Sequence, residues 1–292
     1  MMLRRVRRRL NVSLTQLTAR TTIRSRLRAP VVTFTFDDFP QSAWSVGGRI
    51  LERYNARATY FLSAKFCGQT ISGVRYYDQD DLKAIRANGH ELANHTAHHS
   101  HLPELPAPAI SKEITENAAF LYQIEPDVRM VSFAYPYGSV TPRVKRIVAR
   151  HVSISRGVWP GINHRRIDLG LIKTICLGRR SGGTGGSVAQ WLAKAKRTNG
   201  WLVFLTHDVA AKPRPYGVTP EVLEAIVRQV VDAGIQILPM KNAVGLIAPF
   251  CQKAAPSDDS PPSRTMRRRS VDLGGSGANI GALAEIRDEL GC

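Results

Sequence analysis

The chain has 292 residues and a formal net charge of +18, and its content of 43% hydrophobic and 22% charged residues is that of an ordinary globular protein. One α/β barrel of roughly 200–250 residues with tails fits this length better than two domains do. The longest apolar runs, such as residues 201–205, fall short of the roughly 18–20 residues that a spanning helix needs, which excludes a transmembrane segment.

Residues 1–29 concentrate positive charge, because they contain nine arginines and no acidic residue precedes Asp37. Runs of like charge usually stay solvated, so we expect a flexible basic arm with no specific nucleic-acid partner and only weak contact with an anionic membrane or polymer. No apolar segment follows the first arginines, and the four cysteines show no paired spacing. We therefore expect a cytoplasmic protein, at most peripheral to the inner membrane surface; an organelle transit peptide remains an open alternative.

Between residues 30 and 249, strand-like and helix-like segments alternate, as in parallel βαβ units. We expect strands at residues 31–36, 58–62, 91–94, 130–134, 201–205 and 235–238. We expect helices at residues 50–57, 78–88, 142–150, 188–197 and 220–233. This alternation favours an α/β barrel over residues 30–249. Residues 250–292 are rich in proline, serine and glycine, so we expect a disordered tail.

Four of these strands end in polar clusters. Asp37-Asp38, His95, Tyr135 to Gly138, and Thr206 to Asp208 each follow an apolar segment. In a parallel barrel the carboxyl ends of all strands lie on one face, where active sites are built. We therefore expect these clusters to meet.

The histidines favour a metal site. Five of the eight fall between His90 and His101, and the spacing of His95 and His99 would place them on one face of a helical turn. Asp37-Asp38 offers a carboxylate to complete such a site, although an Asp pair also occurs in turns and helix caps. His207 is a candidate acid, base or ligand, and a structural histidine is an equally open interpretation.

Several motifs together resemble a known family. The segments 33–38 (TFTFDD), 90–99 (HELANHTAHH), 133–138 (FAYPYG) and 205–208 (LTHD) are similar, in order, to motifs of the polysaccharide deacetylases. This group, also called NodB-like or carbohydrate esterase family 4, includes the nodulation chitooligosaccharide deacetylases. The resemblance covers residues 31 to about 245, and the first two motifs in combination are its most specific part.

The resemblance implies a distorted (β/α) barrel of about seven parallel strands that removes N-acetyl groups from a chitooligosaccharide- or exopolysaccharide-type glycan. It implies a divalent metal ion, with zinc as the first expectation, held by Asp38, His95 and His99. Asp37 would be the catalytic base and His207 the catalytic acid. The Tyr137 backbone N–H would bind the oxyanion. Independently of the resemblance, the aromatic residues Tyr135, Trp159 and Trp44 are candidates to stack on sugar rings, and a position in the core is an equally open interpretation for each.

The chain departs from the family pattern in two places. The third motif often carries an arginine where this chain has Ala134, and Arg156 is the candidate to replace it from a neighbouring strand end. The fourth motif's Asp-Trp pair is absent, with Trp159 and Asp168 as the nearest candidates. The missing arginine keeps open the same metal site acting on O-acetyl esters or another non-peptide amide. Two further alternatives are less favoured: an iron oxygenase with a two-His, one-carboxylate triad, against which the strand–helix alternation argues, and a non-catalytic binder of anionic polymers.

Overall fold

The computed structural model describes residues 15, 21–178 and 186–247. The expected basic arm therefore lies largely outside the described residues, and so does the expected tail at residues 250–292. Within residues 1–29, Thr22–Arg24 forms strand β1, which pairs antiparallel with β9 (Arg166–Asp168) on the side of the barrel. This part of the expected arm is thus structured. No helix among the described residues is long and apolar enough to cross a membrane.

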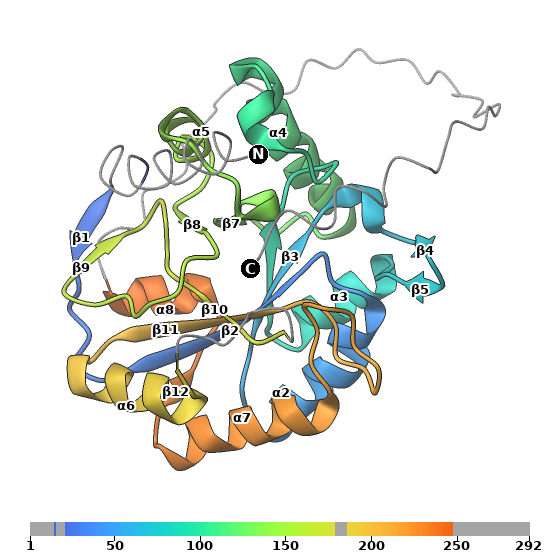
Figure 1. The fold of residues 1–292 in the computed structure, drawn as a ribbon. Coiled ribbons are helices and arrows are strands. Elements are labelled where there is room, and N and C mark those ends of the chain that lie inside the picture. Colours follow the sequence, from blue (N-terminus) through green and yellow to red (C-terminus); the bar gives the residue numbers. More distant parts are fainter. Residues whose placement is uncertain (1–14, 16–20, 179–185, 248–292) are drawn as a thin grey trace, which may run out of the picture.

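The main sheet curls into a distorted barrel, as the sequence predicted. Its path β10-β11-β2-β3-β6-β7-β8 consists of seven parallel strands, and the short β12 pairs with the first residues of β2 (Figure 1). The strands are β2 Val31–Asp37, β3 Thr59–Leu62, β6 Glu91–Asn94, β7 Ser132–Ala134, β8 Ile154–Arg156, β10 Ile175–Cys176, β11 Trp201–Thr206 and β12 Gln236–Ile237. A small hairpin, β4 Thr70–Ile71 and β5 Val74–Arg75, lies outside this sheet.

The two edges of the curled sheet meet at one point. Arg156, the last residue of β8, makes a parallel bridge to Ile172, three residues before β10. The Gly157 N–H donates to the Ile172 carbonyl oxygen at 3.1 Å, and the Ile172 N–H donates to Ser155 at 2.8 Å. The seam of the barrel is therefore closed at the carboxyl end of β8.

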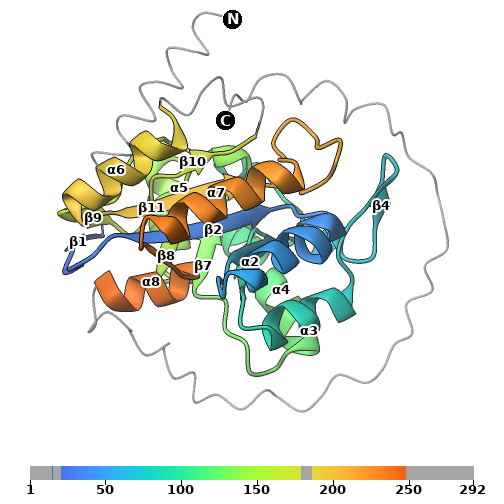
Figure 2. The same ribbon diagram turned by 90° about the horizontal axis from the view of Figure 1, so that it is seen from below.

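Helices lie around the outside of the sheet in both views (Figures 1 and 2). They are α2 Arg49–Arg53, α3 Gln79–Ala87, α4 Ala107–Ile124, α5 Pro142–Val148, α6 Val188–Thr198, α7 Pro220–Asp232 and α8 Met240–Ile247, and a π-helical turn at Ala43–Gly48 precedes α2. Capping explains several starts: Asp78 and Ser187 each form a capping box, while Thr219 caps α7 ahead of Pro220.

Helix α4 is the longest described helix and was not among the helices expected from the sequence. Its buried residues Ile110, Ile114, Asn117 and Leu121 recur every three to four residues, which is the helical period. The prolines at positions 106 and 108 obscured this pattern, although proline is tolerated in a first helical turn.

The core explains why the strands are continuous apolar runs. All seven residues of β2 are buried, as expected for a parallel strand that is covered on both faces. Phe34 packs on Phe204 of β11 with ring centroids 5.3 Å apart, and Phe36 stacks on Tyr60 of β3 at 4.8 Å. Each such buried ring contributes roughly 1.5–3 kcal/mol. The packing fixes the strand ends from which the polar residues project.

Candidate metal centre and surrounding residues

Asp38 lies at the carboxyl end of β2 and faces two histidines. Its φ of 41° is in the left-handed region, so the chain turns sharply as soon as it leaves the strand. Asp38 Oδ2 is 2.8 Å from His99 Nε2, and Asp38 Oδ1 is 3.8 Å from His95 Nε2. The structure thus brings together the three residues that the sequence proposed as metal ligands.

The two histidines converge by a different route from the one expected. His95 directly follows β6, but the chain from there to His99 is not a helical turn. It turns back through Thr96 and His99, whose φ values of 67° and 51° are left-handed. Their imidazole centroids come within 5.0 Å. The expectation of a shared helical face is therefore wrong, because positive φ angles produce the approach instead.

A hydrogen bond fixes the orientation of His95. Its Nδ1 lies 2.8 Å from the carbonyl oxygen of Ala134, the last residue of β7. A carbonyl oxygen only accepts, so Nδ1 carries the proton and Nε2 presents its lone pair toward Asp38. Backbone carbonyls commonly orient metal-binding histidines in this way.

Electrostatics favour the ligand form of these residues. Burial by itself would raise the pKa of Asp38, but His99 and His95 beside it lower that pKa far below its usual range. Burial lowers the pKa of His95 to about 4, against the opposing effect of Asp38. At neutral pH the site therefore combines a carboxylate with a neutral His95.

The three side chains fit a divalent cation. One atom from each, a carboxylate oxygen and two imidazole nitrogens, lies within 4.8 Å of the others. Asp38 Oδ1 is buried and has no hydrogen-bond partner among the described residues. One carboxylate and two imidazoles suit borderline transition metals such as zinc, which leaves open positions when only three protein ligands are present.

Asp37 lies beside this centre and is held by Arg156. Asp37 is the last residue of β2 and is buried, and its Oδ1 accepts a hydrogen bond from the fully buried Arg156 Nη2. The Arg156 guanidinium also lies over the Phe61 ring, 4.7 Å from the centroid. Arg156 is the cross-strand neighbour of Ala134 in the register of β7 and β8. The arginine missing from position 134 is therefore supplied from the adjacent strand.

His207 follows β11, and the charges of Asp38 and His95 in the triad affect its pKa. Burial lowers its pKa to about 3; Asp38 opposes this effect, while Arg214 and Arg156 reinforce it. Its Nδ1 is buried and has no hydrogen-bond partner among the described residues. The carboxylate of Asp168, one of the nearest candidates for the fourth motif's Asp, pairs with Lys145 and accepts from the Gly170 N–H.

The expected aromatic contacts have different outcomes. The Tyr137 ring lies 4.3 Å from that of His99 and remains 39% exposed, on backbone with a φ of 58°. Tyr135, in contrast, is 1% exposed and donates its hydroxyl to the Gly170 carbonyl oxygen at 2.9 Å. The expectation that Tyr135 contacts a sugar is therefore not supported, because its ring is part of the core.

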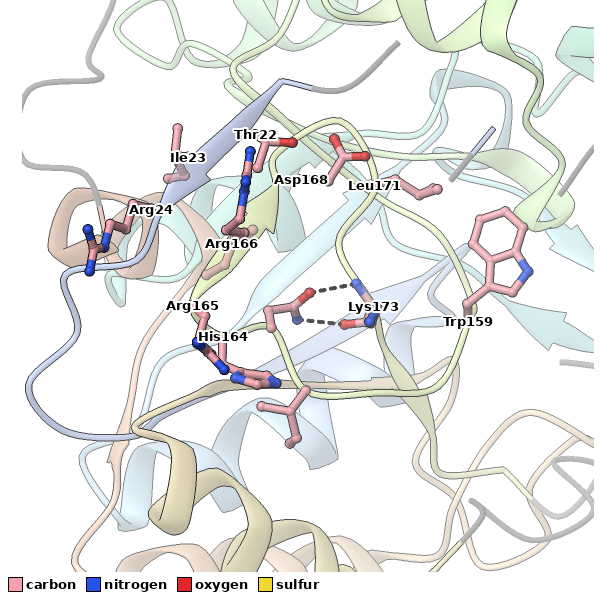
Figure 3. Close-up of a pocket in the computed structure, with 13 residues that line it drawn as sticks. Thr22, Ile23, Arg24, Trp159, His164, Arg165, Arg166, Asp168, Leu171 and Lys173 are labelled. Carbon is pink, nitrogen blue, oxygen red and sulfur yellow. Dashed lines mark hydrogen bonds between the residues drawn. The ribbon is translucent and has the colours of Figure 1, made fainter. Parts of the chain in front are cut away.

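Trp159 lines a separate groove of about 920 Å³ on the side of the barrel. This groove runs along β1 and β9, and Figure 3 shows Trp159 across it from Arg24. The Trp159 ring packs over Gly157, where an added Cβ would come within 2.5 Å of it. None of the three proposed metal ligands lines this groove, so the structure separates Trp159 from the triad.

Residues that sequence reasoning missed surround the triad. Phe66 lies 5.9 Å from His99 by ring centroids and stacks on Tyr76 at 4.8 Å, and Lys65 and Arg214 lie over these two rings. The signal was available for Lys65 and Phe66, because they follow the carboxyl end of β3. Tyr76 and Arg214 lie on long connections, where the strand pattern gives no guide.

The other histidines of the cluster are structural or exposed. His90 is buried, and its Nδ1 accepts from the Ala58 N–H at 3.0 Å. His98 points away from the centre: its side chain is 64% exposed, and its Nδ1 lies 3.0 Å from Glu113. His101 lies 2.9 Å from Ser139. Of the five clustered histidines, only His95 and His99 belong to the triad that the described residues form.

Comparison with known proteins relates part of the chain to a family. Residues 24–152 match the family model of polysaccharide deacetylases. No curated protein sequence gives a significant match.

The fold is similar to solved structures at low sequence identity. An acetyl xylan esterase of family 4 from Clostridium thermocellum, in complex with a cobalt ion, is 19% identical with a TM-score of 0.52 over 74% of this chain and 91% of that one. A carbohydrate esterase family 4 domain of a xylanase from a Trinervitermes trinervoides hindgut metagenome is 20% identical, with a TM-score of 0.51 over 74% and 89%. A family 4 pseudoenzyme from Bacillus anthracis is 15% identical, with a TM-score of 0.53 over 76% and 68%.

The family match and the barrel agree with the ordered motifs in the sequence. Residues 24–152, which include Asp38, His95 and His99, therefore match the polysaccharide deacetylases, a family of hydrolases.

Proposed function

We propose that the protein removes N-acetyl groups from an acetylated oligo- or polysaccharide in a reaction that requires a divalent cation, with zinc as the first candidate. The observation that carries this proposal is the convergence of Asp38, His95 and His99 next to the Asp37–Arg156 pair. A pseudoenzyme shares the fold, so the fold alone does not imply activity. Activity depends on the side chains near the triad.

Each residue near the triad has a chemical part in this proposal. When bound, a divalent cation lowers the pKa of a water molecule and polarises the acetyl carbonyl. Asp37 accepts the proton of the attacking water, and Arg156 holds the Asp37 carboxylate in the orientation for this transfer. The Tyr137 backbone N–H donates to the oxygen of the tetrahedral intermediate. Removing one such donor costs about 3–4 kcal/mol in studied hydrolases.

His207 supplies the proton that the leaving group needs. Because burial lowers its pKa to about 3, His207 is neutral in the free protein at physiological pH. The proton that Asp37 takes from the attacking water must therefore reach His207 before His207 passes it to the sugar nitrogen, and this transfer balances the protons of one turnover. A general acid or base of this kind typically contributes about 10²–10⁴-fold to the rate.

The first test measures acetate released from N-acetylglucosamine oligomers by the full chain, with and without a chelator, together with metal content. We expect the chelator and Asp38→Ala each to lower the rate by about 10³-fold or more, because several kcal/mol of charge stabilisation are lost. His98→Ala is the matched control: it removes an exposed histidine from the same segment and should keep both activity and metal. Full activity of the Asp38→Ala protein in chelator would refute the proposal.

The alternative leaving group is an ester oxygen. One observation favours this alternative: a solved structure with a similar fold, at 19% identity, is an acetyl xylan esterase in complex with a cobalt ion. Parallel rates on acetylated xylan and on N-acetylglucosamine oligomers separate the two reactions. If the rate on acetylated xylan is faster and depends on Asp38, the substrate bond is an ester and not an amide, and the proposed metal centre is retained.

A further inference from the structure

Arg214 is held in a tightly built turn after β11. Its backbone N–H donates to Asp208 Oδ2 at 3.1 Å, and its carbonyl oxygen accepts from the Gly217 N–H at 2.9 Å. A Cβ at Gly217 would come within 1.9 Å of Asp208 Oδ1, so the turn requires glycine there. The position of Arg214 next to His207 is thus fixed by the backbone.

The Arg214 side chain reaches the aromatic pair beside the triad. Its Nη1 donates to the Tyr76 hydroxyl at 2.9 Å, and its Cζ lies 5.5 Å from the centroid of the Tyr76 ring. Tyr76 stacks on Phe66, which in turn lies against His99. Lys65 Nζ lies 4.7 Å from the centroid of Phe66. Two cations therefore rest on one aromatic pair that contacts a metal ligand.

The charge of Arg214 has no counterpart in the described part of the chain. Arg214 is half-buried, yet no described carboxylate lies within ion-pair distance of it, and its Nε is buried without a hydrogen-bond partner there. Asp208 does not serve, because it accepts from the backbone of Arg214 and makes no ion pair. Buried charges are normally paired, so an unmatched guanidinium at this place indicates an anionic ligand.

Neighbouring charges agree with this interpretation. Besides burial, Arg214 contributes to the low pKa of His207, which shows that its positive charge reaches the catalytic surroundings. Lys65 also makes no ion pair with a described residue, although Asp38 and Glu113 act on it electrostatically. Planar guanidinium groups bind oxyanions through two parallel hydrogen bonds, and Lys65 adds a point charge.

We propose that the substrate is an acidic glycan, and that Arg214, assisted by Lys65, binds an oxyanion substituent on the sugar next to the acetyl group. The acetyl chemistry rests on the proposed function, whereas the charge preference rests on Arg214 and Lys65. A sugar carboxylate and a sugar phosphate share this chemistry. Arg214 is in this view a specificity residue that selects acidic glycans over neutral ones.

Direct binding tests the proposal without requiring turnover. Trigalacturonate carries negative charges that its fully methyl-esterified form lacks. Calorimetry of both sugars with the full chain therefore measures how much the negative charge contributes to binding. We expect the acid to bind at least about tenfold more tightly than the ester, since a charge-assisted hydrogen bond is worth roughly 1.5–3 kcal/mol. Competition by inorganic phosphate that matches the acid in affinity would assign the site to phosphate.

Variants locate the preference. Arg214→Gln should lower the acid-to-ester ratio about tenfold, Arg214→Lys should restore part of it, and Lys65→Gln should lower it by a smaller factor. Lys65→Gln keeps the test decisive if Arg214→Gln does not fold. The control is Arg129→Gln, an exposed cation without a described ion pair just before β7, at the opposite end of the barrel. It should leave the ratio unchanged.

Two failures are distinguishable. Equal binding of acid and ester, or a ratio that Arg214→Gln and Lys65→Gln leave unchanged, overturns the charge preference. Charge-selective binding without acetate release from any acetylated glycan overturns the proposed function and leaves the assignment of Arg214 in place. The second readout is kcat/KM on an oligomer of an N-acetylated aminouronic acid and on its methyl ester, which should show the same tenfold ratio.

Discussion

Both ends of the barrel bury a carboxylate from the sheet, Glu91 where β6 begins and Asp38 where β2 stops. We call the end of the barrel where the parallel strands begin the lower end, and the end where they stop the upper end. At the lower end, Glu91 Oε2 accepts from Thr59 Oγ1 at 2.8 Å and from the Lys241 N–H at 3.0 Å, while Oε1 accepts from Ser132 Oγ at 2.6 Å. At the upper end, Asp38 Oδ1 has no hydrogen-bond partner among the described residues.

This difference separates a carboxylate whose acceptors are all used from one that keeps a buried oxygen without a described partner. The lower carboxylate is satisfied and joins three strands to the first turn of α8, so it closes that end of the barrel. The carboxylate of Asp38 keeps a free acceptor oxygen that the proposed cation would use. The number of satisfied acceptors therefore distinguishes the two carboxylates.

The largest expected effect is on catalysis at the upper end. Asp37→Asn keeps the size of the side chain and can still bond Arg156, but it cannot take up a proton. We expect kcat to fall about 10²–10⁴-fold with unchanged metal content and an unchanged unfolding midpoint. Acetate release, metal analysis and denaturation measure these three quantities. A loss of activity below tenfold would remove Asp37 from its role as base.

The matching change at the lower end should affect only stability. Glu91→Ala leaves Thr59, Ser132 and the Lys241 N–H without their buried acceptor, which costs about 3–5 kcal/mol of unfolding free energy. Glu91→Gln keeps one acceptor oxygen and should cost less. Urea unfolding measures the loss, and kcat per folded molecule should change less than about twofold. A tenfold fall in kcat would show that the two ends are coupled.

Low pH should reduce the unfolding free energy of the metal-free protein, because His207 at the upper end of the barrel is buried. The pKa of His207 is about 3 in the folded chain against an ordinary value of 6.5, so the unfolded chain binds more protons between these values and stability falls as pH drops below 6.5. We expect His207 to contribute a loss on the order of 1–2 kcal/mol by pH 5. His207→Asn should reduce the difference in unfolding free energy between pH 7.5 and pH 5, and an unchanged difference would contradict the burial of this ring.

The smallest expected effect tests a residue that the structure moves out of the site. Tyr135→Phe removes the hydroxyl that donates to Gly170 and should cost about 0.5–1.5 kcal/mol of stability. Because the ring lies in the core, kcat/KM should stay within about twofold for every glycan. A rise in KM without a loss of stability would indicate that Tyr135 contacts the sugar.

Local patterns in the sequence predicted much of this architecture. Apolar runs followed by polar residues located the carboxyl ends of β2, β6, β7 and β11, and parallel topology then brought Asp38 and His95 to one face. These features depend on neighbours in sequence. The position of Arg156 was also within reach, because a missing arginine at Ala134 directed attention to the adjacent strand.

Other features depend on contacts that no local pattern encodes. The pairing of β1 with β9 joins segments more than 140 residues apart. The approach of His99 to Asp38 results from left-handed backbone at Thr96 and His99, whereas four-residue spacing suggested a helix. Tyr135 faces inward because strand alternation turns it to the core, although its neighbour Tyr137 reaches the triad.

Arg156 takes part in two contacts: its backbone bridges to Ile172 at the seam of the barrel, and its side chain donates to the Asp37 carboxylate. One residue therefore links the closure of the sheet to the orientation of the Asp37 carboxylate. A substitution that opens the contact between residues 156 and 172 should for this reason also displace Asp37.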